Sequence, residues 1–177
     1  MRIRNYRQVD IPTLNELLQL SGEMDGFKAK DMLDFDAWPI DPELEAAYKV
    51  FVITNDDESI EWGQGGTLEG VEGEIVGFTA LHMWEDASAY HFLCMGTVHP
   101  QHRRQQAGRA LMICALNYAR IVSAEFEFEA EEEGRPIYLE ALLPLRDPAS
   151  VYLATKCEMQ PTDGSMVKGM KLYRREL

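Results

Sequence analysis

A strand, a polar loop and a helix follow one another between Tyr90 and Val122, and this junction limits the folds open to the chain. Residues 90–98 are rich in aromatic and β-branched side chains and stop at His99-Pro100, a dipeptide that favours leaving regular structure. From Ala107 onward, apolar residues recur at three- and four-residue steps, as in an amphipathic helix. A strand that leads directly into a helix predicts a domain of the α/β or α+β class.

The loop inside this junction gathers positive charge at a helix start. Arg103, Arg104 and Arg109 cluster where the first N–H groups of the helix have no intrahelical acceptor. Free backbone donors, the positive end of the helix dipole and guanidinium charge together favour an anion, best a phosphate or pyrophosphate. The small Ala107 and Gly108 let such an anion approach the backbone closely. The alternative interpretation is a solvated basic helix start that binds nothing.

The remaining sequence predicts short elements on both sides of the junction. Asp10 is expected to cap a helix that carries Pro12 in its first turn and ends at Gly22, and Asp147-Pro148 to start another through Lys156. The dipeptides Trp38-Pro39 and Asp41-Pro42 break residues 23–48 into short helical pieces. Further strands are expected over residues 1–7, 49–55, 73–83, 137–143, 158–161 and 166–174.

Two acidic stretches are expected to connect elements. Residues 56–74, rich in acidic residues and glycine, predict a surface excursion with a small hairpin near 63–66, which could border a substrate cleft. Residues 125–134 are mostly glutamate, and their mutual repulsion favours a solvated connector that ends at Gly134. The alternative for this second stretch is an acidic patch that binds a partner.

Length and composition narrow the class of protein. A chain of 177 residues is most simply one domain, 1–177, and it has no apolar run of the roughly 18 residues needed to cross a bilayer. The basic amino terminus lacks a signal-peptide core, so we expect a cytoplasmic protein. Cys94, Cys114 and Cys157 have no metal-ligand spacing, and we expect reduced residues and no metal.

Charge bears on the partners. Thirty acidic residues against seventeen basic ones give a formal net charge of −13, which argues against nucleic acid or an anionic membrane surface as partner. A cationic substrate fits better. The alternative is that the charge only keeps the protein soluble. The sequence leaves open whether the protein forms a homodimer.

The junction resembles the cofactor motif of the GNAT superfamily of N-acetyltransferases, which reads approximately Val-x-Pro-x-x-Arg-x-x-Gly-x-Gly/Ala with a leucine three residues on. Val98, Pro100, Arg103, Gly108 and Leu111 match it, whereas Gln106 stands at the first glycine. The resemblance implies that the loop amides hold the pyrophosphate of acetyl-CoA and that the preceding strand end pairs with its pantetheine arm. The residues it assigns to the cofactor are Gly96, Thr97, Val98, Arg103, Arg104, Gln105, Gln106, Ala107, Gly108 and Arg109.

The resemblance also suggests catalytic residues. Family members commonly carry a Tyr-x-x-x-Gly-Phe pattern whose tyrosine hydroxyl approaches the CoA sulfur; Tyr152 matches the tyrosine, but the Gly-Phe pair and an asparagine seven residues upstream, here Leu145, are replaced. The alternative for Tyr152 is a core residue with a bonded hydroxyl. For the base we prefer His91, with His82 and Glu140 as other candidates in or beside strands.

The resemblance covers nearly the full length and implies an acyltransferase fold, a central, mostly antiparallel mixed sheet flanked by helices. It implies transfer of the acetyl group of acetyl-CoA to an amine of a small molecule or protein by direct attack, with no metal. Two alternatives remain: a catalytically degenerate relative that binds CoA, and a fold reused as a structural or interaction subunit.

Overall fold

Seven strands form one sheet in the computed structural model, which describes residues 1–55, 73–164 and 167–177. Their order is β1-β2-β3-β4-β5-β7-β6, and every neighbouring pair is antiparallel except β4 and β5, which run parallel. This confirms the predicted mixed, mostly antiparallel sheet. The strands are β1 (Arg2–Asn5), β2 (Tyr48–Asn55), β3 (Glu74–Glu85), β4 (Tyr90–Val98), β5 (Ile137–Pro144), β6 (Gln160–Pro161) and β7 (Met170–Glu176).

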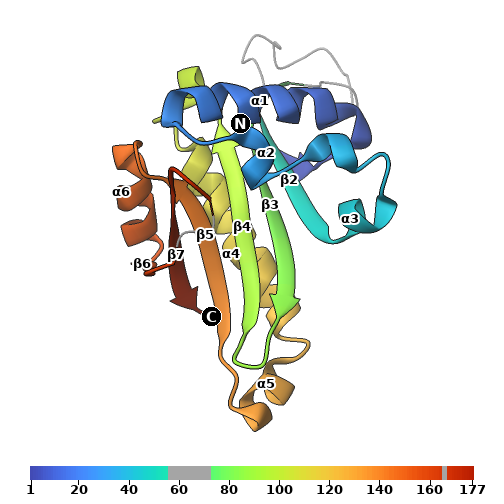
Figure 1. Ribbon diagram of the computed structural model, residues 1–177, viewed down its shortest axis with the longest axis vertical. Helices are drawn as coiled ribbons and strands as arrows, with labels where there is room; N and C mark the ends of the chain where they lie inside the picture. Colours follow the sequence, from blue (N-terminus) through green and yellow to red (C-terminus); the bar gives the residue numbers. More distant parts are fainter. Residues whose placement is uncertain (56–72, 165–166) are drawn as a thin grey trace, which may run out of the picture.

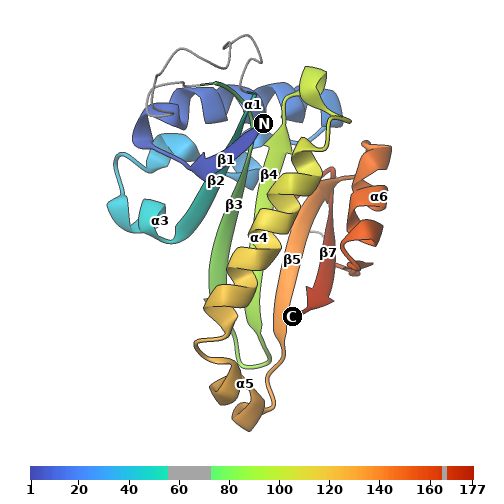
Figure 2. The same cartoon turned by 180° about the vertical axis from the view of Figure 1, so that it is seen from behind.

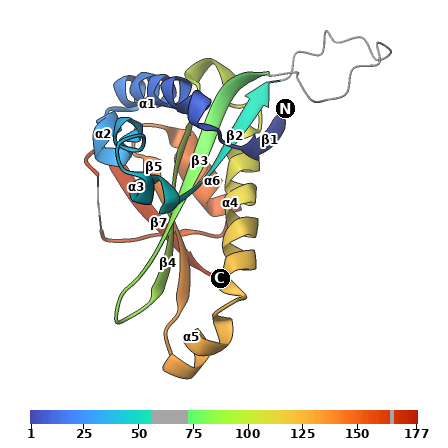
Figure 3. The same cartoon turned by 90° about the vertical axis from the view of Figure 1, so that its right-hand side faces the viewer.

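Helices cover both faces of the sheet (Figures 1 and 2). One face carries α1 (Ile11–Asp25), α2 (Ala29–Met32) and α3 (Pro42–Ala46), and the other carries α4 (Ala107–Ser123) and α6 (Pro148–Lys156). The view along the sheet in Figure 3 separates these layers and shows α5 (Glu127–Glu133) beyond the strand ends. None of the helices in the described ranges is long and apolar enough to span a membrane.

The two-residue period of the strands divides the core between the faces. Phe78 and Leu93 pack in the core beneath α1, whereas Leu81 and Phe92 pack against α4. Successive side chains of a strand point to opposite faces, so both sides of the central strands are apolar and both can be covered by helices.

The parallel pair creates an opening in the sheet. The ladder pairs Tyr90 to Cys94 of β4 with Ile137 to Ala141 of β5, and β4 then continues to Val98 and β5 to Pro144. The last residues of both strands therefore leave the ladder at the end of the sheet where α4 and α6 begin.

The first helix begins where predicted, with Asp10 at its N-cap position and Pro12 in its first turn, but it ends later than predicted. It continues past Gly22 to Asp25 and ends at Gly26, whose φ of 80° is left-handed. Gly22 instead provides space for another backbone segment, because a Cβ there would lie 2.6 Å from the carbonyl oxygen of Phe27. The Asp10 side chain, however, makes no capping bond to α1; it accepts hydrogen bonds from Arg4 and from the Arg7 amide, which caps the short 3-10 turn Gln8–Asp10.

The connector predicted over residues 125–134 is wrong in part, because its centre forms α5. Glutamate is a good helix former, and Glu127 and Glu129 lie in the first turn, where negative charge is favourable. Ala130 is buried, and Phe126, just before the helix, packs against Tyr90 with ring centroids 4.8 Å apart. This packing outweighs charge repulsion, and the helix ends at Gly134 as expected.

The other predicted connection, residues 56–74, lies almost wholly outside the described residues. Its hairpin near 63–66 and its position relative to any cleft stay predictions.

Candidate functional site

The diverging ends of β4 and β5 border a cleft of about 320 Å³. Its walls come from both strand ends, the loop before α4, the starts of α4 and α6, and the end of α1. The interior is mainly apolar, with side chains that include Phe78, Leu111, Met112, Leu142 and Leu153. The charged lining residues are Asp25, Arg103, Arg104, Arg109, Asp147 and Lys156.

The loop before α4 has an unusual backbone. Arg104 and Gln106 have φ values of 65° and 70°, in the left-handed region that non-glycine residues seldom enter. Such a conformation costs of order 1–3 kcal/mol per residue and persists only where neighbouring structure fixes it. The family glycine at the position of Gln106 therefore has a physical explanation, since glycine enters this region without that cost.

Replacing Gln106 by glycine is expected to raise the free energy of unfolding by up to about 1 kcal/mol. Glycine avoids the roughly 1–2 kcal/mol that the left-handed conformation costs an L-residue. Its greater conformational freedom in the unfolded chain lowers stability by about 0.5–1 kcal/mol, which offsets part of this stabilisation. Denaturant unfolding measures the difference. Gln105→Gly is the matched control, because Gln105 has no positive φ and should only lose stability. Equal losses in both variants would contradict this account.

The two small residues at the start of α4 have different roles. Ala107 is buried and packs with Ile53, Val76 and Leu111, so its size serves the core and not the approach of an anion as predicted. Gly108 faces open space, because a Cβ there would meet only a methyl group of Val98, at 3.7 Å. The space beside the backbone at Gly108 can thus receive a ligand.

Three cationic side chains lie at the entrance of the cleft. Arg104 is exposed, with its nearest ion-pair contact to Asp147 at 3.9 Å, and Arg109 is exposed without an ion pair in the described part of the chain. Sequence reasoning missed Lys156, whose Nζ lies 5.5 Å from the ring centre of Tyr152. The four-residue spacing of these two residues on one helix was the available signal.

Arg103 has a different environment from the one predicted. Its guanidinium donates to both carboxylate oxygens of Asp25, at 2.9 and 2.7 Å, and its Nε donates to the Val98 carbonyl oxygen at 3.2 Å. Burial alone would lower the pKa of Arg103, but the hydrogen bonds with Asp25 outweigh it and raise that pKa. Arg103 is thus held inside the protein and is not a free cation for an anion in the loop.

Tyr152 lines the cleft from α6 and is 65% exposed, so the alternative of a core tyrosine is wrong. Its helix begins as predicted, with the Asp147 carboxylate accepting from the Ala149 amide at 2.9 Å and Pro148 in the first turn. This start fixes which face of α6 points to the cleft.

Cys94 lines the cleft but is not a ready nucleophile. Its sulfur lies 3.1 Å from the Thr79 hydroxyl, and burial raises the pKa of the thiol to about 11. The thiol is therefore protonated near neutral pH and behaves as a small apolar residue.

None of the three candidate bases lies in the lining of the cleft. His91 is the second residue of β4, whereas the cleft borders the other end of that strand, and its ring is stacked on Trp84 with centroids 3.9 Å apart. His82 is stacked on Tyr48, and burial lowers the pKa of its imidazole. The sequence placed these residues on strands but could not show which strand end would open.

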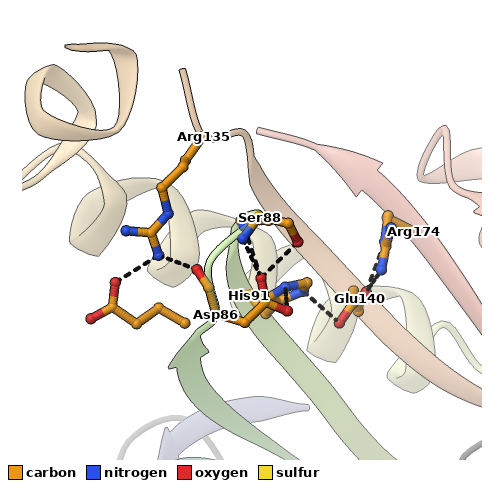
Figure 4. A network of polar contacts seen from close by, with 8 residues as sticks. Asp86, Ser88, His91, Arg135, Glu140 and Arg174 are labelled. Carbon is orange, nitrogen blue, oxygen red and sulfur yellow. Dashed lines mark hydrogen bonds and ion pairs between the residues drawn. The ribbon is translucent and has the colours of Figure 1, made fainter. Parts of the chain in front are cut away.

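His91 and Glu140 instead belong to a polar network away from the cleft (Figure 4). Glu140 is 2% exposed, lies 3.2 Å from His91 Nδ1, and accepts from Arg174 Nε at 2.7 Å. Asp86 lies on the other side of His91, 3.4 Å from Nε2, and hydrogen bonds from Ser88 lower the Asp86 pKa to about 2. The network thus links β4, β5 and β7.

The site suits a ligand that has phosphate groups and a long uncharged arm. Cations and the free amides of α4 face the entrance, the open side of Gly108 leaves room beside the backbone, and the interior is apolar. Within the described ranges, no group of three or more His, Cys, Asp and Glu side chains is placed to hold a metal ion.

Comparisons with known proteins agree with this geometry. The model of the acetyltransferase (GNAT) family matches residues 25–140. The chain is similar to a phosphinothricin acetyltransferase from Sinorhizobium meliloti solved with acetyl-CoA, at 14% identity and a TM-score of 0.60, over 99% of this chain and 88% of that one. It is similar to a ribosomal-protein-alanine N-acetyltransferase from Brucella melitensis, at 15% identity and a TM-score of 0.55, over 100% of both chains.

A spermidine N-acetyltransferase from Vibrio cholerae, solved as an F149A mutant, has the same fold, at 11% identity and a TM-score of 0.57, over 98% of this chain and 92% of that one. A search of curated protein sequences found no match. At these identities the solved structures show a shared fold, and their different acceptors cannot be transferred by likeness alone.

Proposed function

Because the chain belongs to the acetyltransferase (GNAT) family, we propose that it transfers the acetyl group of acetyl-CoA to an amine of a small molecule or protein. The observation that carries this proposal is the cleft between β4 and β5, with an apolar interior and cations at its entrance. An apolar wall suits a pantetheine arm, and the start of α4 with Arg104 and Arg109 suits a pyrophosphate.

The cofactor site that we propose combines the backbone from Gln105 to Arg109 with the end of β4. The first N–H groups of α4 have no intrahelical acceptor and can donate to phosphate oxygens. Gly96 to Val98 lie beyond the part of β4 that pairs with β5, so their backbone can pair with an extended arm. Gly96 also needs its lack of a side chain, because a Cβ there would lie 2.3 Å from the Phe78 carbonyl oxygen.

Acetyl-CoA, when bound, supplies an acyl group activated as a thioester. For direct attack the amine must be neutral, and negative charge that develops on the acyl oxygen needs a donor. We assign that donor to a backbone N–H group between Gly96 and Val98, and we assign to the Tyr152 hydroxyl the proton for the departing sulfur. We assign no residue to the deprotonation of the amine, because His82, His91 and Glu140 lie outside the described lining of the cleft.

The acceptor that we propose is an amine, preferably a cationic one. The net charge of −13 favours approach of cations. The described part of the lining gives no further support, because its two carboxylates are engaged: Asp25 binds Arg103, and Asp147 caps α6 and faces Arg104. Transfer assays with a polyamine, free amino acids and peptides with free amino termini would separate the acceptor classes.

Calorimetry with acetyl-CoA tests the cofactor site. We expect micromolar affinity for the wild type and an affinity about tenfold or more weaker for the Arg104→Ala, Arg109→Ala double variant, since a hydrogen bond to a charged group contributes about 1.5–3 kcal/mol. Arg120→Ala, at the other end of α4, is the control and should bind normally. No binding by folded wild type at millimolar ligand would refute the proposal.

A second candidate function is a relative that binds CoA without transferring acetyl groups. The observation that favours it is the absence of the three candidate bases from the described lining of the cleft. Micromolar acetyl-CoA binding without transfer to any acceptor class, together with CoA that co-purifies in mass spectrometry, would support this candidate over the enzyme.

A further inference from the structure

We infer that Asp25 is a positioning residue for the cofactor loop, residues 99–106: through Arg103 it holds this loop in the geometry that binds a pyrophosphate. The inference rests on the proposed function, since the ligand it concerns is CoA. It assigns a role to a side chain from α1, on the opposite face of the sheet from α4.

The ion pair between Asp25 and Arg103 has a fixed geometry. Both carboxylate oxygens of Asp25 accept from the two terminal nitrogens of Arg103, at 2.9 and 2.7 Å. Asp25 is 3% exposed, and the Arg103 side chain is largely buried. Two parallel charge-assisted bonds between planar groups fix orientation as well as distance.

Arg103 extends this contact to other walls of the cleft. Its Nε donates to the Val98 carbonyl oxygen at the end of β4, and one terminal nitrogen lies 3.9 Å from the Asp147 carboxylate that caps α6. One guanidinium therefore meets the end of α1, the end of β4 and the start of α6. A shift of Asp25 would therefore change the contacts of the Arg103 guanidinium at all three places.

Asp25 can act as an anchor because the turn that follows it is closely packed. A Cβ at Gly26 would lie 2.8 Å from the Arg146 guanidinium, and a Cβ at Gly169 would lie 2.5 Å from the Gly26 carbonyl oxygen. The Arg146 side chain, which precedes α6, and Gly169, which precedes β7, thus lie against this turn. A carboxylate directly before such a turn has little freedom to follow the loop.

The loop needs such an anchor. Arg104 and Gln106 are both exposed and both left-handed, a conformation that surrounding structure must impose. Arg103, directly before them, has a side chain that reaches into the protein and contacts Asp25 and the Val98 carbonyl oxygen. With that side chain released, the backbone between Arg103 and Ala107 is expected to relax, and its N–H groups would no longer converge on one anion.

A direct role for Arg103 predicts the opposite result. If its guanidinium were a phosphate ligand and Asp25 only neutralised it, Asp25→Asn would free the cation and tighten CoA binding. If Asp25 positions the loop, the same variant weakens binding. The sign of the change therefore decides between the two roles.

The test measures CoA by calorimetry and pantetheine, which lacks the pyrophosphate, by NMR titration. We expect Asp25→Asn to bind CoA about tenfold or more weakly and pantetheine as the wild type does, because misplacement of binding groups by about 1 Å is costly. Arg103→Lys keeps the charge but loses the two-pronged contact, and it should show the same selective loss. A merely structural role would lower the melting temperature without separating the two ligands.

Asp10→Asn is the matched control. Asp10 makes the same two-pronged contact with Arg4, at 2.7 and 2.9 Å, and is equally buried, but it does not line the cleft. This variant should lose stability and keep its affinity for CoA.

CoA affinity that is unchanged or tighter in Asp25→Asn would overturn the inference. If this variant does not fold, unchanged CoA affinity in Arg103→Lys would overturn it instead. Wild-type protein that does not bind CoA at all refutes the proposed function, and this inference with it.

Discussion

Replacing Tyr152 by phenylalanine is expected to lower turnover about tenfold or more and to leave the affinity for acetyl-CoA nearly unchanged. The ring would keep its place in the cleft lining, and only the hydroxyl group would be lost. A proton donor to the departing sulfur acts in the transition state and not in the bound ground state, so kcat should fall while binding is kept. A tenfold loss corresponds to about 1.4 kcal/mol of transition-state stabilisation.

Steady-state kinetics and calorimetry on the same preparations would separate these effects. Tyr118→Phe is the matched control, because it removes the same hydroxyl group from a tyrosine that packs on Phe51 outside the cleft. Its turnover should equal that of the wild type. Full turnover in Tyr152→Phe would remove Tyr152 from the mechanism, and weaker acetyl-CoA binding with unchanged turnover would make it a binding residue.

The Glu140→Ala variant should lose about 3 kcal/mol of folding free energy, at the lower end of the range of about 3–5 kcal/mol for breaking a buried ion pair. Glu140 is almost fully buried between Arg174 and His91, and its loss leaves a guanidinium and an imidazole without their acceptor (Figure 4). The lower end applies because Arg174 is 37% exposed and can turn toward water.

Denaturant unfolding with an unchanged slope would measure this loss. Glu158→Ala is the control, because Glu158 pairs with Arg175, the residue of β7 next to Arg174, and is 80% exposed. Exposed pairs contribute roughly 0–1 kcal/mol, so this variant should stay close to the wild type. Similar losses in the two variants would show that burial of Glu140 does not determine its contribution.

Most elements of the fold could be predicted because their signals are local. The strand, loop and helix at β4 and α4, and the Asp147-Pro148 start of α6, follow from periodicity and capping over a few residues. The structure differs where distant contacts decide. Phe126 against Tyr90 stabilises a helix among repelling glutamates, and the carbonyl of Phe27 explains why Gly22 does not end α1.

The cleft itself was less accessible to sequence reasoning. The Arg103 to Gly108 loop could be found as an anion site because helix starts and arginines are visible in sequence. That Arg103 would turn inward could not, because its partner, Asp25, is far away in the chain and is fixed by tertiary packing. The sequence favours His91 as the base, but the opening of the sheet lies at the other end of its strand.

The parallel pairing of β4 and β5 also bears on the order of folding. β3 and β4 are joined by a short turn, whereas residues 99–136 separate β4 from β5 and must form a crossover before those strands can meet. Closing such a distant pair costs more chain entropy, so we expect it to form late. The binding cleft lies at this seam and should be among the last features to appear in a refolding chain. A ligand that binds in this cleft would stabilise only the molecules in which β4 and β5 have already paired.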